Sequence, residues 1–347
     1  MITQFDDISD IHLCVSDPSN SVVFADPARA DLMRWPQLLP PMMLDQALSL
    51  LQLCQNQQES SLREDFMIAY GDFRFRARLC QQGLDGWWFR LRKMQQETAF
   101  LNSLPTPLPE YLTTLMMSPE LSTMGGLIFV LGAPGSGKTT TASGIVATRL
   151  SMLGGFGYTV EDPPEMPLNG WYRYENPDDP TDVVQGYCSQ NTVNNRSPDP
   201  WGEAIREALR SQPTGSSRIL YIGEVRDKFC ARALLKAASD GFLVIATGFG
   251  QDVINGLDGL LRLAGQAGGD PEALNNDLAN CLRLAVHQTI NPQGYLDLEV
   301  LTSTLPTGRV ANAIRSNGIG RLKSIILEQR NQGKNNYKLV FGRDDQE

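Results

Sequence analysis

One segment of this sequence has the residue types and spacing of a phosphate-binding loop. Residues 132–139 read Gly-Ala-Pro-Gly-Ser-Gly-Lys-Thr and fit the Walker A pattern G-x-x-x-x-G-K-[ST] at every fixed position. Glycines let backbone N–H groups converge on phosphate oxygens, the lysine reaches the β- and γ-phosphates, and the following hydroxyl ligates Mg²⁺. The pattern predicts that Lys138 binds the phosphates of ATP and that Thr139 binds Mg²⁺. The residues predicted to contact the nucleotide here are Gly132, Ala133, Pro134, Gly135, Ser136, Gly137, Lys138, Thr139 and Thr140.

The segments on either side of this loop are those that its chemistry requires. An apolar, strand-sized run at residues 126–131 precedes it, and a helix-forming run at residues 139–150 follows it. A helix that begins at the loop adds the positive end of its dipole to the phosphate site. Because strand, loop and helix are consecutive, a glycine-rich turn that matches by chance is disfavoured.

Two further segments place carboxylates at the ends of predicted strands. Residues 160–165 read Val-Glu-Asp-Pro-Pro-Glu, and residues 218–227 read Arg-Ile-Leu-Tyr-Ile-Gly-Glu-Val-Arg-Asp. Pro163 and Pro164 stop the first strand and hold the carboxylates at its carboxyl end, where an open parallel sheet places its ligands. Glu224 follows the second strand and can hold Mg²⁺ or its water shell. The alternative interpretations are solvated loop charges and a strand-capping acid.

Together with a helical segment at residues 203–210, these motifs resemble the ATPases that drive type IV pili and type II and type IV secretion, especially the PilT-like motors. The resemblance covers residues 125–333 well and the N-terminal part only faintly. It implies a RecA-like fold and the hydrolysis of ATP. By resemblance, Glu165 would polarise the attacking water, and Asp162, with Glu161, would shape the environment of the metal and the base. Asp162 is thereby predicted as a Mg²⁺ ligand beside Thr139 and Glu224.

The sequence departs from the family pattern in two places. Where the family has a Gly-Thr-x-His-Thr box, residues 246–250 read Ala-Thr-Gly-Phe-Gly, and neither His12 nor His287 matches the missing histidine. Where the family has Gln-Arg-Glu-Val, residues 190–193 read Gln-Asn-Thr-Val. These departures bear on turnover more than on nucleotide binding. They favour, as the alternative to a motor, a nucleotide-binding regulatory or structural ring component with little turnover.

An arginine-bearing hairpin is predicted in the N-terminal part. Residues 73–79 alternate strictly between apolar residues and arginine, so the three arginines share one side of a half-exposed strand, and residues 87–91 form its hairpin partner. By resemblance, Arg76 and Arg90 would reach across a subunit boundary to the γ-phosphate of the nucleotide. The alternative is an ordinary hairpin with a solvated basic face.

The order of these patterns predicts two domains. Residues 1–100 form a small PAS-like α/β domain, in which residues 44–57 carry Leu44, Leu48, Leu51 and Cys54 on one helix face. Residues 101–122 form a proline-containing linker and a first helix. Residues 123–347 form a RecA-like α/β domain with a mostly parallel sheet and helices on both faces, because predicted strands alternate with helices.

Composition restricts the class of protein further. Over 347 residues the formal net charge is −9, which disfavours direct binding of nucleic acid. The six cysteines are scattered and lack the spacing of a zinc site, so reduced thiols are expected. The sequence contains neither a signal peptide pattern nor an apolar run of the roughly 20 residues that a membrane span needs. We expect a cytoplasmic protein that is peripheral at the inner membrane through its partners.

These features combine to predict an ATP-hydrolysing motor of a type IV pilus or secretion system. The resemblance implies a homo-oligomeric ring, a hexamer, that acts on an inner-membrane platform protein. A retraction-type motor is favoured because assembly motors of this family often carry a four-cysteine zinc element, which this sequence lacks.

Overall fold

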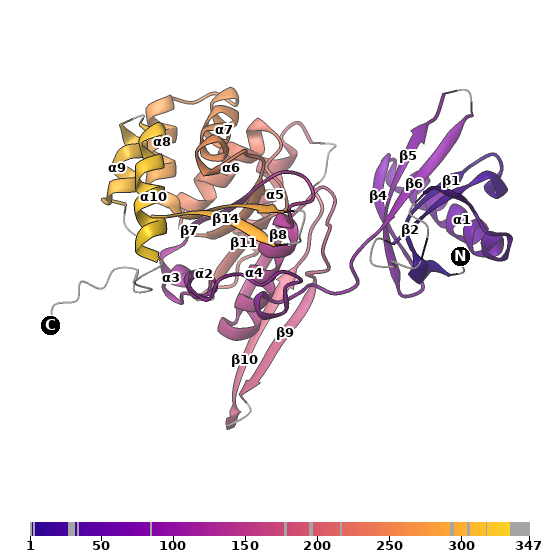
Figure 1. Cartoon of the computed structure of the whole chain (residues 1–347), viewed down its shortest axis with the longest axis horizontal. Helices are drawn as coiled ribbons and strands as arrows, with labels where there is room; N and C mark the ends of the chain where they lie inside the picture. The colour runs from indigo at the N-terminus through magenta and orange to yellow at the C-terminus, as the bar shows by residue number, and fades with distance from the viewer. Residues whose placement is uncertain are drawn as a thin grey trace. The chain divides into compact units, whose positions relative to one another are not determined.

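A computed structural model of the chain divides into two compact units, Met1–Glu97 and Thr98–Glu347 (Figure 1). No helix among the described residues is long and apolar enough to cross a membrane. The described residues are 2, 4–26, 32, 35–83, 85–176, 179–193, 197–215, 217–291, 295–303, 306–316 and 318–333.

The first unit is an antiparallel sheet with one long helix, α1 (Leu44–Ser61), packed on one face. The strand order is β3-β2-β1-β6-β5-β4. The strands are β1 (Ile8–Cys14), β2 (Val22–Ala25), β3 (Gln37–Leu38), β4 (Asp65–Tyr70), β5 (Phe73–Gln81) and β6 (Trp87–Lys93), and the short 3-10 helices are η1 (Phe5–Asp7), η2 (Pro18–Asn20) and η3 (Pro41–Met43). This is the small α/β domain that the sequence predicts at the N-terminus.

The buried face of α1 overlaps with the predicted face and is not identical to it. Ala47, Leu50, Leu51 and Cys54 are buried, whereas Leu48 is 45% exposed. The spacing of the buried residues follows one helical stripe, and Leu48 lies just outside it. Including Leu48 in the apolar face was therefore wrong, because the stripe that packs on the sheet runs through Ala47, Leu50, Leu51 and Cys54.

The predicted hairpin of β5 and β6 is confirmed. The two strands pair antiparallel from Phe75 opposite Lys93 to Gln81 opposite Trp87. Phe75 and Ala77 are buried, while Arg76 lies on the opposite face of β5 with the arginines on either side of it. The alternation of apolar residues and arginine therefore follows the two-residue period of the strand.

The second unit contains a mostly parallel sheet with the order β14-β13-β7-β12-β11-β8-β10-β9. The pairs inside this sheet are parallel, and only the edge strands β14 and β9 run antiparallel to their neighbours. The prediction of a mostly parallel sheet is confirmed. The strands are β7 (Gly126–Leu131), β8 (Gly155–Val160), β9 (Gly170–Asn176), β10 (Asp179–Ser189), β11 (Arg218–Ile222), β12 (Leu243–Gly248), β13 (Leu282–Ile290) and β14 (Leu296–Thr302).

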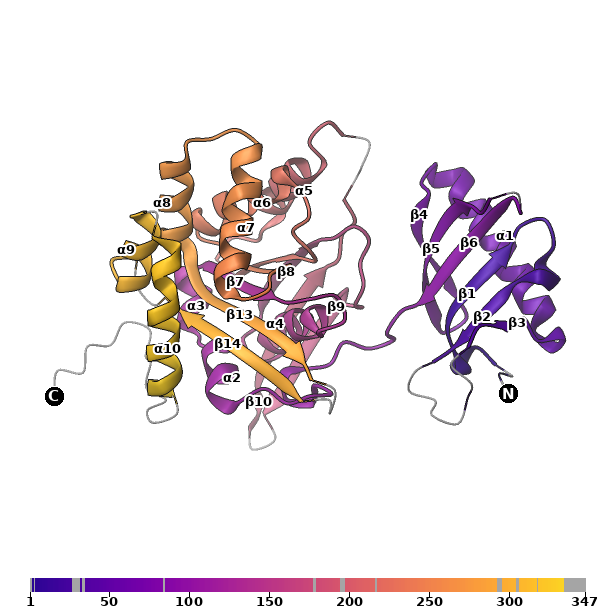
Figure 2. The same cartoon turned by 45° about the horizontal axis from the view of Figure 1, so that its top comes forward.

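Helices cover both faces of this sheet (Figure 2). Alternate residues of β7 show the division, because Leu127, Phe129 and Leu131 pack into one core and Ile128 and Val130 into another. The second of these cores is closed by α2 (Glu110–Met116), α3 (Glu120–Met124) and α4 (Lys138–Leu153), with η4 (Leu101–Ser103) beside them. The first is closed by α5 (Pro200–Ser211), α6 (Lys228–Ser239), α7 (Val253–Gln266), α8 (Pro271–Cys281), α9 (Arg309–Arg315), α10 (Leu322–Gly333) and η5 (Ile319–Arg321).

The proline-containing stretch after residue 100 packs on the second unit. Leu101, Leu104 and Leu108 are buried in the same core as α4. The backbone N–H of Leu101 also donates a hydrogen bond of 2.9 Å to Oγ1 of Thr148. These leucines, before and between the prolines, give the stretch an apolar side, so it covers part of the sheet instead of forming only a connection.

A buried arginine fixes the helices that follow this stretch. Arg149 of α4 is fully buried, and its guanidinium donates to the carbonyl oxygens of Met116 and Ser118 at 2.7 and 3.1 Å and to Oγ of Ser122 at 2.7 Å. Burial lowers the pKa of Arg149 to about 10. One side chain therefore donates hydrogen bonds to the last residue of α2, to the connection after it and to a residue of α3.

Replacement of this arginine tests its role in stability. We expect Arg149→Met to lower the free energy of unfolding by about 3 kcal/mol or more, because it leaves buried carbonyl oxygens without donors. The measurement is urea denaturation beside Arg262→Met, which removes an exposed ion pair with Asp258 and should change stability by less than about 0.5 kcal/mol. Equal effects of the two variants would contradict this account.

Candidate functional site

The phosphate-binding loop lies between β7 and α4, as its sequence context predicts. Gly137 is the N-cap of α4 with φ of +81°, so the helix begins directly at Lys138. Gly132 has φ of +151°, and a Cβ atom there would lie 2.5 Å from Oγ of Ser136. Both positions therefore require glycine, and the loop brings its backbone close to the helix N-terminus.

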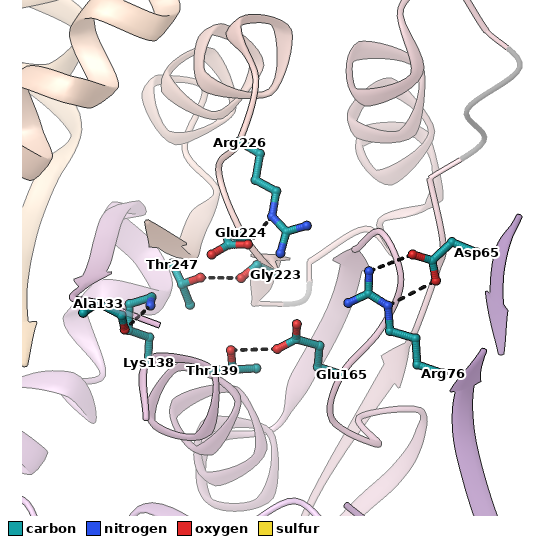
Figure 3. Close-up of polar contacts among 10 residues, drawn as sticks. All are labelled: Asp65, Arg76, Ala133, Lys138, Thr139, Glu165, Gly223, Glu224, Arg226 and Thr247. Atoms are coloured by element: carbon teal, nitrogen blue, oxygen red, sulfur yellow. Dashed lines mark hydrogen bonds and ion pairs between the residues drawn. The ribbon is translucent and has the colours of Figure 1, made fainter. Parts of the chain in front are cut away.

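Lys138 points back over this loop. Its Nζ donates a hydrogen bond of 2.9 Å to the carbonyl oxygen of Ala133 (Figure 3). Burial lowers the pKa of Lys138, and the positive charge of Arg226 lowers it further. The negative charges of Glu224 and Glu165 act to raise it. The ammonium group thus lies within the field of carboxylates from two separate segments of the chain.

A direct hydrogen bond joins the loop helix to the acidic segment after β8. Oγ1 of Thr139 donates to Oε2 of Glu165 at 3.0 Å (Figure 3). Glu224, which follows β11, accepts from Nε of Arg226. These groups line one hollow of about 120 Å³. Its lining residues are Thr139, Glu161, Asp162, Pro163, Glu165, Trp201, Gly223, Glu224, Arg226 and Asp227.

The structure therefore brings together most of the predicted site residues of the second unit. The three predicted metal ligands, Thr139, Asp162 and Glu224, line this hollow beside Glu165. Thr140 follows Thr139 in the first turn of α4 and is half-buried. A hydroxyl and carboxylate oxygens are the donors that Mg²⁺ prefers, and Lys138 with the adjacent glycine loop suits an anionic phosphate chain. The residues present fit ATP with Mg²⁺.

Gln190 holds the acidic segment, residues 161–165, in place through three hydrogen bonds. Its Nε2 donates to Oε1 of Glu161 at 3.0 Å and to the carbonyl oxygen of Met166 at 2.6 Å, and its Oε1 accepts from the backbone N–H of Leu168 at 3.2 Å. These contacts lie on both sides of Glu165. Gln190 matches the first residue of the family's Gln-Arg-Glu-Val, but a motif match does not show which groups a side chain contacts. Its three contacts were therefore not predicted.

Burial makes Glu161 a poor site for a negative charge. The side chain is 1% exposed, and burial raises its pKa to about 7. The hydrogen bonds from Gln190 and Thr159 act in the opposite direction. At neutral pH, Glu161 is therefore divided between its protonated and ionised forms while it supports the acidic segment.

Two consecutive residues of β13 contact the loops at this edge of the sheet. Nε2 of Gln288 donates to the carbonyl oxygen of Ser136 at 2.5 Å. Nε2 of His287 lies 3.1 Å from the carbonyl oxygen of Gly250, in the stretch that departs from the histidine box. Sequence reasoning missed both residues. The pairing of β13 with β7 places His287 opposite Leu131, directly before the phosphate-binding loop, and this pairing is known only from the structure.

The two arginines predicted to act across a subunit boundary lie in the first unit. Nε and Nη2 of Arg76 donate to the carboxylate of Asp65 at 3.1 and 2.8 Å (Figure 3). Arg90 pairs across the strands with Arg78 and with His12. Burial lowers the pKa of His12, and Arg90 lowers it further.

Comparisons with known proteins identify relatives of this chain in both sequence and structure. The sequence model of the family described as "Type II/IV secretion system protein" matches residues 86–293, more than half of the chain. Among curated relatives, "Uncharacterized protein YggR" of Escherichia coli is 29% identical over 65% of this chain and 64% of its own length. "Type IV pilus ATPase PilU" of Pseudomonas aeruginosa is 25% identical over 71% of this chain and 58% of its own length. The chain thus spans less than two thirds of either relative.

A solved structure shares the fold of most of the chain. The pilus retraction motor PilT, determined with bound ADP, superimposes with a TM-score of 0.66 at 23% identity, covering 93% of this chain and 86% of PilT. At this level of identity the likeness concerns the fold. An N-terminal unit with an antiparallel sheet followed by a unit with a mostly parallel sheet is therefore a fold that this chain shares with PilT.

The pKa of Glu161 predicts a pH-dependent stability. The pKa in the folded chain, about 7, exceeds the ordinary value of 4.5, so the folded state binds the proton more tightly than the unfolded state. The resulting stabilisation is complete below about pH 4.5 and is lost as the pH rises through 7, by up to about 3 kcal/mol. Glu161→Gln cannot ionise and lacks this loss.

Urea denaturation in EDTA, without nucleotide, at pH 5 and at pH 8 measures this effect. The free energy of unfolding of Glu161→Gln, relative to that of the wild type, should be higher at pH 8 than at pH 5. A difference between the two proteins that does not change with pH would show that Glu161 has an ordinary pKa.

Proposed function

The chain belongs to the family of type II/IV secretion system proteins, and from this premise we propose that it is an ATP-hydrolysing motor of a type IV pilus or secretion system. One relative of the chain is the type IV pilus ATPase PilU. The observation that carries the proposal is the hydrogen bond between Thr139 and Glu165. It joins the phosphate-binding loop to the acidic segment in a hollow that Glu224 also lines.

The predicted site residues in and beside this hollow have proposed tasks. Lys138 binds the β- and γ-phosphates of ATP, while Thr139, Glu224 and Asp162 hold Mg²⁺ or its water shell. Bound Mg²⁺ would neutralise charge on the phosphates. Glu165 orients and polarises the attacking water, and Gln190 keeps the segment that carries Glu165 in place through its contacts on both sides.

The assembly around this site is also part of the proposal. A hexameric ring would place Arg76 and Arg90 of one subunit against the γ-phosphate held by its neighbour, where arginine can raise the rate by about 10³–10⁵. The ring would be cytoplasmic and would act on an inner-membrane platform protein. A retraction-type motor is supported by the scattered cysteines, which do not form the four-cysteine element of assembly motors.

A second candidate function is a nucleotide-binding ring component with little turnover. It is favoured by Phe249, which stands where the family has its box histidine. Half of this side chain is exposed, and a phenyl ring cannot hydrogen-bond a phosphate as imidazole can. This candidate predicts tight binding of ATP without release of phosphate.

Steady-state phosphate release with ATP and Mg²⁺ separates the two candidates. For the motor, turnover should rise with protein concentration as the ring assembles. Glu165→Gln should lower kcat by about 10²–10⁴, the contribution of a positioned base, while it keeps nucleotide affinity. The matched control is Glu175→Gln, which changes an exposed carboxylate of β9 that pairs with Arg173.

The control variant should turn over ATP as the wild type does. A wild type that binds ATP but releases no phosphate at any concentration would refute the motor and support the second candidate. Full activity of Glu165→Gln would show that another group orients the water.

A further inference from the structure

A large apolar side chain lies against the charged end of Lys138. Phe249 follows β12, and half of it is exposed. Nζ of Lys138 lies over this ring, 4.9 Å from its centroid. At this distance the negative face of the ring attracts an ammonium group.

We propose that Phe249 is a positioning residue for Lys138, which it holds by a cation–π interaction in the orientation that binds phosphate. The proposal rests on the proposed function only in taking the loop at residues 132–139 as the nucleotide site. It assigns a task to the stretch at residues 246–250, in which the family histidine is missing. Phe249 acts on the phosphates through the lysine and not by touching them.

The hydrogen-bonding capacity of Lys138 is compatible with this task. An ammonium group has three donors, and Lys138 uses one of them on the carbonyl oxygen of Ala133 at 2.9 Å. The ring attracts the charge without needing an acceptor lone pair, so two donors remain for phosphate oxygens. Burial lowers the pKa of Lys138, and an adjacent ring face favours the charged form that phosphate binding requires.

The backbone on either side of Phe249 is held by neighbouring segments. Before the ring, Oγ1 of Thr247 donates to the carbonyl oxygen of Gly223, and the N–H of Val225 donates to the carbonyl oxygen of Thr247 at 2.9 Å. After the ring, Nε2 of His287 meets the carbonyl oxygen of Gly250 at 3.1 Å. Contacts from the segment after β11 and from β13 thus fix the stretch that carries the ring.

The same strand also fixes the loop that carries Lys138. Gln288, next to His287 in β13, donates to the carbonyl oxygen of Ser136 at 2.5 Å. Two consecutive residues of β13 therefore hold both the phosphate-binding loop and the stretch that carries Phe249. This arrangement fixes the two backbone segments from which the ring and the lysine side chain extend.

A series of fluorinated phenylalanines at position 249 tests the proposal. Stepwise fluorination weakens the negative face of the ring while it nearly preserves its shape, so a packing role would not respond in a graded way. We expect affinity for the non-hydrolysable analogue AMP-PNP with Mg²⁺ to fall with each fluorine, by about two- to tenfold over the series. The matched control is the same series at Phe229, whose ring faces Lys228 at 5.1 Å, and this series should leave the affinity unchanged.

The outcomes separate this proposal from the proposed function. A wild type that does not bind AMP-PNP would refute the nucleotide site itself. A wild type that binds, with an affinity that stays flat or rises across the series at position 249, would refute the role of Phe249 alone.

The anchoring role of His287 has its own test. Phe249→Leu and His287→Ala should each weaken AMP-PNP binding, and the double variant should lose less than the product of the two effects, because both act through one ring. If the affinity loss of the double variant equals the product of the two single losses, His287 does not act through Phe249.

Discussion

The second unit depends on one constraint, which is that parallel strands end at the same edge of a sheet. β7, β8, β11 and β12 are joined in parallel register, so the segments that follow them meet there. Each of these segments carries polar groups that could not be placed inside the apolar sheet. Short loops at a shared edge bring Lys138, Glu165 and Glu224 together, although they are far apart in the sequence.

The charges at this edge are balanced by groups of the chain itself. Thr139 donates to Glu165, Arg226 donates to Glu224, and Lys138 is held by Ala133 and by the ring of Phe249. Polar groups that are removed from water need such partners. The same groups are those that ATP with Mg²⁺ would engage, so binding of the nucleotide exchanges one set of partners for another.

The sequence predicted what is local and missed what depends on distant pairing. The phosphate-binding loop follows from eight consecutive residues, and the bounds of β7 and β11 follow from apolar runs that end before a glycine. The contacts of Gln190 and His287 could not be predicted, because they depend on which strands lie side by side. The edge hairpin of β9 and β10 was also missed, since its exposed strand lacks an apolar run.

Calorimetric titration with ATP and Mg²⁺ tests the central claim, that the loop before α4 is the nucleotide site. The wild type should bind, and Lys138→Ala should bind at least about tenfold more weakly, because it loses charge-assisted hydrogen bonds. Lys236→Ala, which removes an exposed lysine paired with Asp240, should bind as the wild type does. Equal affinity of all three proteins would contradict the account and place the nucleotide elsewhere.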